Sequence, residues 1–189
     1  MLHQAAQFLL DVILQPFAVI LLLRFHMQWL RVPMRNQFGE FIMALTNFIV
    51  LRTRRFIPAI KGYDTSTLLL AYLFETLYMY LYEFAWVYQT PESHMILSLL
   101  GIGVVKLLSI SLTLLMIAVI VQAILSWFRP NTMFEPILNV ITSPFIKPLQ
   151  RRIPPAGGVD LSAFVLIVII QLLQMLPIYY LDRLVRSLI

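Results

Sequence analysis

Four apolar segments, separated by polar stretches, dominate the pattern of hydrophobic and polar positions along the chain. They cover residues 8–23, 68–88, 107–128 and 161–181. The last two contain no Asp, Glu, Lys or Arg, whereas Asp11, Glu75 and Glu83 interrupt the first two. Because about 20 apolar residues cross the hydrocarbon core of a bilayer as a helix, the pattern predicts four membrane-spanning helices.

The chain also repeats itself at an offset of 96 residues, without a gap. The aligned pairs are Phe38 and Phe134, Thr46 and Thr142, Arg55 and Arg151, Pro58 and Pro154, Gly62 and Gly158, Asp64 and Asp160, and Ser66 and Ser162. We therefore predict two tandem units, 1–94 and 95–189, each made of a helix, a basic linker and a second helix. The four spanning helices are expected at about 8–31, 65–88, 104–128 and 160–184. Two spans return each unit to the same side of the membrane, so the copies form parallel hairpin repeats.

Each linker is expected to contain a further helix, over about 37–52 and about 132–147. Apolar residues recur there at helical spacing, and polar residues such as Glu40 and Asn139 occupy the other side. These stretches are too short to span, which suits amphipathic helices lying in the membrane interface. A helix packed beneath the bundle is the alternative. Pro144 and Pro148 predict an early end to the second linker helix, since proline removes a helix hydrogen bond.

Composition and charge agree with this all-α membrane fold. Charged residues make up only 12% of the chain and the mean hydropathy is +0.86, whereas soluble domains carry about 25% charged residues. Basic residues gather in the two linkers, and none lies between the second and third predicted helices. The positive-inside rule then places the linkers in the cytoplasm and both termini in the periplasm, although Arg183 and Arg186 oppose this orientation. This distribution points to membrane surface and away from nucleic acid.

Three strings in the second unit carry a family resemblance. They are Ser126-Trp-Phe-Arg-Pro-Asn131, Pro144-Phe-Ile-Lys-Pro148 and Arg151-Arg-Ile-Pro-Pro-Ala-Gly-Gly-Val-Asp-Leu-Ser162. They resemble the signature of the YggT (YlmG) family, and the first unit keeps a degenerate version of it. The two-copy form is most similar to members in the inner membrane of Gram-negative bacteria. The resemblance implies a multi-pass inner-membrane protein linked to osmotic tolerance and cation, especially potassium, homeostasis. Plastid and cyanobacterial relatives imply roles in assembling membrane complexes, including haem attachment to a cytochrome, and in nucleoid distribution.

The most regular motif precedes the second helix of each unit. Its members are Gly62, Asp64 and Ser66 in the first copy and Pro154, Gly158, Asp160 and Ser162 in the second. Glycine permits a tight turn, and Asp or Ser accepts hydrogen bonds from the unpaired amides of a helix start. The motif therefore predicts a helix cap. A pair of carboxylates that attracts cations is the alternative, which the basic residues nearby oppose.

Two basic clusters are candidates for contact with lipid or with a partner. They consist of Arg52, Arg54 and Arg55, and of Lys147, Arg151 and Arg152. Each such residue contributes about 1 kcal/mol of attraction to an anionic membrane surface. A soluble partner, or retention of topology alone, would explain the same residues.

Five polar residues are predicted to lie within the spans and to form a cluster at mid-depth: Arg24, His26, Glu75, Gln122 and Gln171. Counting helix rise from the cytoplasmic ends predicts an ion pair between Arg24 and Glu75. The repeat register aligns His26 with Gln122 and Glu75 with Gln171. Hydrogen bonding between helices is one interpretation of the cluster, and a proton- or cation-responsive site is the other.

The sequence contains no motif for catalysis, nucleotide binding or metal binding, and it has no cysteine. We therefore expect neither an enzyme nor a cofactor. Three hypotheses remain: a factor that supports ion or osmotic homeostasis, a scaffold for another membrane complex, and a channel or transporter that forms a homo-oligomer.

Overall fold

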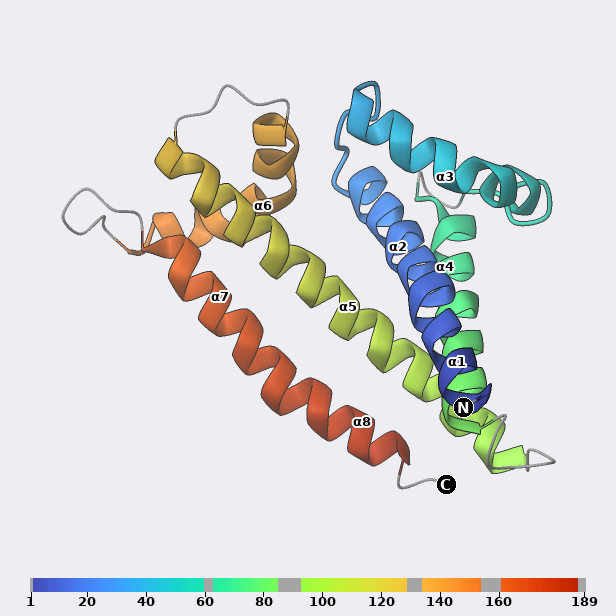
Figure 1. Cartoon of the computed structure of the whole chain (residues 1–189). Helices are drawn as coiled ribbons and strands as arrows, with labels where there is room; N and C mark the ends of the chain where they lie inside the picture. Colours follow the sequence, from blue (N-terminus) through green and yellow to red (C-terminus); the bar gives the residue numbers. More distant parts are fainter. Residues whose placement is uncertain (1, 60–62, 85–92, 129–133, 154–160, 187–189) are drawn as a thin grey trace.

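The computed structural model describes residues 2–59, 63–84, 93–128, 134–153 and 161–186, and its regular elements there are all helices (Figure 1). Segments labelled η are single π-helical turns. The elements are α1 (Leu2–Leu9), η1 (Leu10–Leu14), α2 (Gln15–Trp29), α3 (Gln37–Thr53), α4 (Thr65–Met79), η2 (Tyr80–Phe84), α5 (Ser93–Phe128), α6 (Phe134–Gln150), α7 (Ser162–Leu173), η3 (Gln174–Ile178) and α8 (Tyr179–Arg186).

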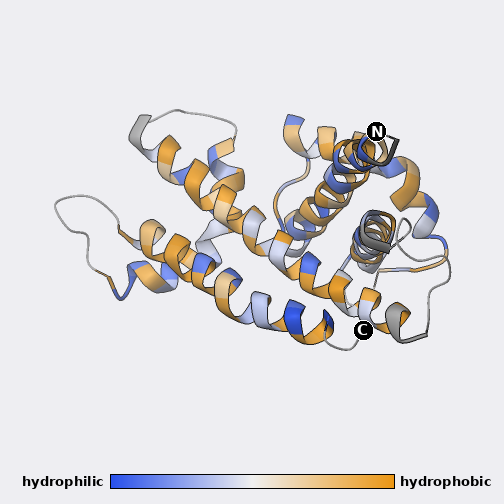
Figure 2. Ribbon diagram, turned by 60° about the horizontal axis from the view of Figure 1, so that its bottom comes forward, coloured by the Kyte–Doolittle hydropathy of each residue, from blue (hydrophilic) through white to orange (hydrophobic). Residues whose placement is uncertain are grey.

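Three of the described helices are long and apolar enough to cross a membrane. They run over Gln4–Trp29, Ile96–Ser126 and Ser162–Arg186. Figure 2 shows that hydrophobic residues cover most of these helices. The protein is therefore all-helical with the character of a membrane protein. The helix formed by α4 and η2 is not among the three; it carries Glu75.

The π-helical turns in the first and last spans lie beside prolines. In η1, the amide of Gln15 bonds to the carbonyl of Leu10 immediately before Pro16, and η3 contains Pro177. Proline has no amide hydrogen for the usual helix bond, and a wider turn lets the neighbouring groups find partners. Each span therefore continues past its proline.

The arrangement places the two linker helices at one end of the molecule. In Figure 1, α2 and α4 lie side by side, α3 crosses their ends, and α6 lies at the same end beside α5. The opposite end holds α1 and α8. Four clusters of buried apolar residues join these elements, and one of them joins α2, α3 and α6 through Met27, Ile42 and Ile137.

Two predicted boundaries differ from the structure. The helix α5, which contains the third span, begins at Ser93, well before residue 104, and it includes Gly101 and Gly103, where α8 and α4 approach it closely. The early end predicted for the second linker helix is wrong, since α6 continues through Pro144 and Pro148 to Gln150. Buried Ile137 and Ile146 pack on either side of Pro144. Their packing outweighs the hydrogen bonds that the prolines remove.

Gly103 gives a test of the contact between α4 and α5. A Cβ atom at this position would lie 3.1 Å from Tyr72 Cε2 and closer still to Thr76 Oγ1. We expect Gly103→Val to lower the free energy of unfolding in detergent by about 2 kcal/mol, as overpacking does elsewhere. Val104→Ile is the matched control, because Val104 is half exposed on the same helix. A Gly103→Val protein as stable as its control would contradict the close contact.

Candidate functional site

Asp64 is the centre of a compact network at the start of α4. It is the N-cap residue of this helix, and its Oδ1 accepts hydrogen bonds from the Thr67 amide (3.4 Å) and the Ser66 hydroxyl (2.6 Å). The Thr67 hydroxyl donates to Oδ2. The guanidinium of Arg54, just after α3, binds both oxygens, with Nη2 2.5 Å from Oδ2. The network therefore ties the end of α3 to the start of α4.

These partners stabilise the negative charge of the Asp64 carboxylate. Burial alone would raise the pKa of its carboxyl group, but hydrogen bonds from Arg54, Ser66 and Thr67 outweigh burial and lower this pKa to about 2. Asp64 is therefore ionised and neutralised by Arg54 at physiological pH. The alternative interpretation of the motif requires a carboxylate that attracts a free cation. A carboxylate already paired with Arg54 is poorly suited to this.

The rest of the motif is only partly described. Ser66 and Ser162 are both buried in the first turns of α4 and α7. Gly62, Pro154, Gly158 and Asp160 lie outside the described residues, so the role predicted for them stays a prediction.

Arg24 makes a second connection between a span and α3. Its side chain is only 2% exposed, and its Nη1 donates to Thr46 Oγ1 (2.5 Å) and Asn47 Oδ1 (2.9 Å). The Thr46 hydroxyl donates in turn to the Ile42 carbonyl (2.6 Å). Arg24 thus holds the middle of α3 against α2, while Arg54 holds its end against α4.

The ion pair predicted between Arg24 and Glu75 is absent from the described part of the chain. Arg24 lies five residues before the end of α2, and the charged groups that act on it are Arg54 and Asp64. Glu75 lies ten residues into α4, and the charged group that acts on it is Lys106 of α5. The two side chains therefore lie at different positions along the bundle and have different charged neighbours.

In the second copy, a neutral residue makes the equivalent connection. The Gln122 side chain of α5 donates to Asn139 Oδ1 (2.6 Å) and accepts from the Thr142 hydroxyl of α6. Thr142 also donates to the Leu138 carbonyl (2.8 Å), as Thr46 does to Ile42. Thr46 and Thr142 are thus equivalent buried contacts between a linker helix and the preceding span.

The other three residues of the predicted cluster have separate surroundings. His26 bonds through Nδ1 to the Leu22 carbonyl of its own helix (2.7 Å). Glu75 is 2% exposed, and its Oε2 has no hydrogen-bond partner among the described residues. Gln171 is exposed on α7 and contacts Met116 Sδ at 3.1 Å. No hydrogen bond joins any two of the five residues in the described structure, and the cluster at mid-depth stays a prediction.

Most of the predicted contact residues lie on the surface. Arg52, Arg55, Lys147, Arg151 and Arg152 are exposed. Arg54 is the exception, because its guanidinium binds Asp64. Within the described segments, no group of three or more His, Asp or Glu residues could hold a metal ion.

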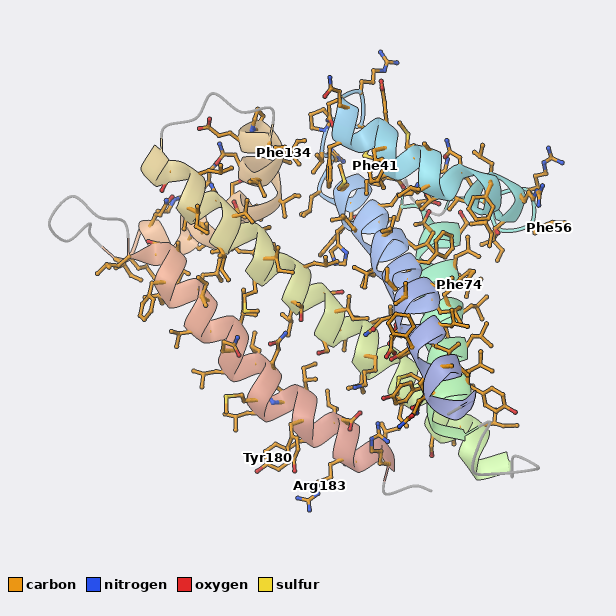
Figure 3. The ribbon with its side chains drawn as sticks, viewed as in Figure 1. Phe41, Phe56, Phe74, Phe134, Tyr180 and Arg183 are labelled. Carbon is orange, nitrogen blue, oxygen red and sulfur yellow. The ribbon has the colours of Figure 1, made fainter. Side chains whose placement is uncertain are left out.

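The exposed side of α3 carries a stripe of apolar residues. Phe41, Leu45 and Phe48 are exposed at helical spacing, whereas Ile42, Thr46 and Val50 are buried on the other face. Phe56, just beyond α3, is 85% exposed and points away from the bundle (Figure 3). Apolar residues on both faces mean that α3 is not divided simply into an apolar and a polar side.

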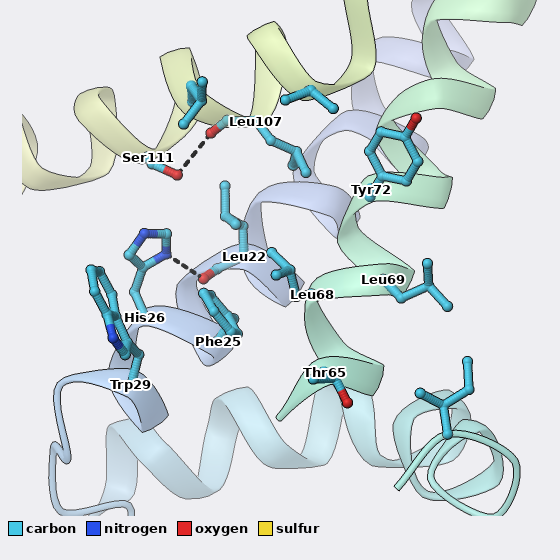
Figure 4. Close-up of a pocket in the computed structure, with 13 residues that line it drawn as sticks. Leu22, Phe25, His26, Trp29, Thr65, Leu68, Leu69, Tyr72, Leu107 and Ser111 are labelled. Atoms are coloured by element: carbon cyan, nitrogen blue, oxygen red, sulfur yellow. Dashed lines mark hydrogen bonds between the residues drawn. The ribbon is translucent and has the colours of Figure 1, made fainter. Parts of the chain in front are cut away.

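A groove of about 710 Å³ lies between α2, α4 and α5 (Figure 4). Apolar side chains provide most of its wall. The lining residues are Leu22, Phe25, His26, Trp29, Ile57, Thr65, Leu68, Leu69, Tyr72, Val104, Leu107, Leu108 and Ser111. The sequence pattern did not predict this groove, because its size depends on the distances and angles between packed helices.

The roles of Thr46, Asn47 and Asn139 as hydrogen-bond partners were also not predicted from the sequence. Thr46 and Thr142 aligned in the repeat register, and this alignment was the available signal. A polar residue repeated on the apolar face of a linker helix indicates a buried hydrogen bond, since such groups are rarely left without partners.

Comparison with known families agrees with the two-part sequence pattern. The family model CCB3/YggT matches residues 3–85 and 102–181. The chain belongs to the CCB3/YggT family. The two matched segments contain all three of the polar connections to linker helices described above, made by Arg54, Arg24 and Gln122.

Several CCB3/YggT relatives match most of the chain. "Uncharacterized protein YggT" of Escherichia coli (strain K12) is 30% identical over 89% of this chain and 86% of its own length. "Uncharacterized protein PA0392" of Pseudomonas aeruginosa is 31% identical over 94% of this chain and 90% of its own length. An uncharacterized protein of Haemophilus influenzae is 31% identical over 83% of this chain and 82% of its own length. No solved structure matches the chain.

Proposed function

We propose that this CCB3/YggT protein is a non-enzymatic inner-membrane factor that supports osmotic tolerance and potassium homeostasis by modulating a transporter. The osmotic and potassium roles follow from the family resemblance of its motifs. Support for the proposed mode of action comes from the two linker helices, which hydrogen bonds hold at one end of the bundle. Scaffolding of another membrane complex through the same surface is the second candidate.

The proposal includes a fourth span and an orientation. The helix from Thr65 to Phe84 has 20 residues, or about 30 Å at 1.5 Å per residue, which matches the hydrocarbon core. It packs against α2 and α5, which belong to two of the three candidate spans. Four spans form two parallel hairpins and bring α1 and α8 to the same side. The basic linkers then face the cytoplasm and both termini face the periplasm.

The polar side chains within the spans support this mode of action, because two of them form hydrogen bonds with the linker helices. Arg24 and Gln122 bind the linker helices α3 and α6. Neither is left to line a path for ions, and Gln171, although exposed, contacts Met116 of α5. Intramembrane polar groups that bind neighbouring helices stabilise the bundle. These contacts favour a rigid protein that binds a partner through its linker helices over one that conducts ions through a pore.

The surface that we propose for contact lies on α3. Its exposed residues Phe41, Leu45 and Phe48 form one stripe, which Arg52 and Arg55 continue. An apolar stripe next to cations suits the boundary between headgroups and acyl chains, where it would lie as an amphipathic helix. The edge of the stripe that faces the cytoplasm is then available to a protein partner.

Two measurements test this proposal together. We expect purified protein in liposomes to carry no potassium flux above that of empty vesicles, with an ionophore as the positive control. We also expect Phe41→Ser/Phe48→Ser to abolish rescue of a deletion strain in potassium-poor, hyperosmotic medium, whereas Glu75→Gln retains it. The matched control is Ile117→Ser/Ile124→Ser on α5, which removes two apolar side chains that are exposed on a span.

The opposite results would each overturn a different part of the proposal. Potassium flux that is lost in Glu75→Gln would make the protein itself a transporter. Rescue by Phe41→Ser/Phe48→Ser, at a normal membrane level of the protein, would exclude the α3 stripe as the contact surface. A deletion strain without any growth defect in this medium would remove the osmotic role.

A further inference from the structure

The groove between α2, α4 and α5 has a wall that offers few hydrogen-bond donors. The side chains of His26, Thr65, Tyr72 and Ser111 all lie in it, and each bonds to a backbone carbonyl. Figure 4 shows two of these bonds, from His26 to Leu22 and from Ser111 to Leu107. Because these donors already bond to backbone carbonyls, the remaining surface of the groove is mostly hydrocarbon. A groove of this size is in the range that encloses a small molecule, and its chemistry favours an acyl chain over an ion or a polar solute.

One end of the groove differs from the rest. Trp29, at the end of α2, lines it and is 47% exposed. Tryptophan is typical of the membrane–water boundary because its ring is apolar and its indole N–H donates a hydrogen bond. This end of the groove therefore lies at the level where the ester groups of a phospholipid are found.

An exposed cation follows this end of the groove in the chain. Arg31 lies two residues beyond Trp29, before α3, whereas Arg55 lies past the far end of this 17-residue helix, near Ile57. The acidic residue next to Thr65 is Asp64, whose charge is already neutralised by Arg54. The charge at this end of the groove is therefore positive and complements an anionic headgroup.

The backbone at Arg31 provides an independent observation. α2 ends in a Schellman motif, in which the Val32 amide bonds to the Met27 carbonyl (2.8 Å) and the Arg31 amide to that of Gln28 (3.1 Å). Arg31 therefore has a φ of 56°, in the left-handed region. Glycine is the usual residue at this position, because a side chain there is strained. A cation at a site that favours glycine points to a function for its charge.

We propose that the groove holds one acyl chain of an anionic phospholipid, such as phosphatidylglycerol, and that Arg31 binds the phosphate of its headgroup. This lipid site is distinct from the stripe on α3. It requires that the helices lie in a membrane, but it does not depend on the osmotic role. The bound lipid would fill the space between the α2–α4 pair and α5.

The test is a lipid titration of the full chain, purified in detergent and stripped of lipid, followed by native mass spectrometry. We expect phosphatidylglycerol to bind more tightly than phosphatidylcholine. Arg31→Gly should weaken phosphatidylglycerol binding about fivefold, the contribution of one basic residue near a lipid headgroup. It should not lower the melting temperature, since glycine suits the left-handed backbone. Arg183→Ala is the control for loss of one cation, because Arg183 is exposed on α8 at the opposite end of the molecule (Figure 3).

A second variant tests the acyl-chain part of the groove. Leu108 lines the groove and is 47% exposed, so Leu108→Trp should fill the space without overpacking the bundle. We expect it to reduce binding of both lipids. Ile117→Trp is the control, because Ile117 is 49% exposed on α5 and does not line the groove.

Three outcomes would overturn the proposal. Equal binding of the two lipids, unchanged in Arg31→Gly, would exclude a headgroup site. Unchanged binding in Leu108→Trp would place the lipid elsewhere. A protein dimer that Leu108→Trp dissociates would show that the groove takes a helix of a second copy.

Discussion

Asp64→Ala is expected to lower the free energy of unfolding by about 3 kcal/mol. Loss of a helix N-cap costs about 1 kcal/mol. The buried hydroxyl groups of Ser66 and Thr67, which both donate to this carboxylate, then lose their acceptor at about 1 kcal/mol or more each. Arg54 is 38% exposed and can return to water, so its own contribution is small. Unfolding titrations with dodecyl sulphate in mixed micelles would measure the change.

Two further variants separate the parts of this effect. Asp64→Asn keeps an acceptor for the Thr67 amide but loses the charge, and we expect it to be about half as destabilising. Glu40→Ala, on the exposed side of α3, is the control and should stay within about 0.5 kcal/mol of the wild type. If Asp64→Ala and Glu40→Ala unfold alike, the network at Asp64 does not stabilise the fold.

The same network predicts a pH dependence. The pKa of Asp64 is lowered from 3.8 to about 2, so its carboxylate stabilises the folded state fully at pH values above 3.8. This contribution is lost as the pH falls through about 2, where the folded protein also binds the proton. The difference in stability between the wild type and Asp64→Asn should therefore be constant from pH 6 to 8 and shrink as the pH falls from about 4 to 2. A difference that stays constant over the acidic range would contradict the ionised pair.

The two copies of the repeat use different chemistry at equivalent places. Arg24 aligns with Ile120, and Arg54 aligns with Gln150, so the second copy lacks both cations that hold α3. Gln122 takes over the contact with Thr142. The helix that carries the exposed aromatic stripe, α3, is therefore bound by two cations that have no counterpart at the aligned positions of the second copy.

Much of the helical pattern could be predicted because it depends on apolar length and periodicity. The linker helices begin and end within about three residues of the predicted positions, since their caps and periodic residues are local signals. The start of α5 could not be predicted in this way. Glycine is unfavourable inside a helix, but α5 contains Gly101 and Gly103, where Val185 and Thr76 approach closely.

The partners of polar side chains were harder to predict than the helices. The depth of Arg24 and Glu75 along their helices was estimated from helix rise, but depth does not tell which neighbour a side chain faces. Arg24 faces α3, where Thr46 and Asn47 accept its hydrogen bonds. The position of α3 across the ends of α2 and α4 is a tertiary feature that no local pattern contains.

Gly39 forms a close contact that the sequence also did not reveal. It lies in the first turn of α3, where its amide donates to the Asn36 side chain (2.8 Å). A Cβ atom here would lie 2.8 Å from Met34 Cα and 2.9 Å from its carbonyl carbon, and closer still to the carbonyl oxygen. All three are backbone atoms, which cannot move aside as a side chain can. In the second copy the aligned residue is Glu135, so this constraint belongs to the first copy alone.

We expect Gly39→Ala to lower the free energy of unfolding by about 3 kcal/mol. A glycine-to-alanine change inside a helix normally stabilises it by about 1 kcal/mol, so the contact reverses the usual sign. The reason is that the chain from Arg31 to Asn36 must shift, which disturbs the cap of α3 and the packing of Val32 with Met27 and Ile42. Gly101→Ala is the matched control. There a Cβ atom meets only the Val185 side chain, and the stability should change by less than about 1 kcal/mol. Mixed-micelle unfolding of both variants decides the matter, because a Gly39→Ala protein at least as stable as Gly101→Ala would mean that Met34 does not lie against the first turn of α3.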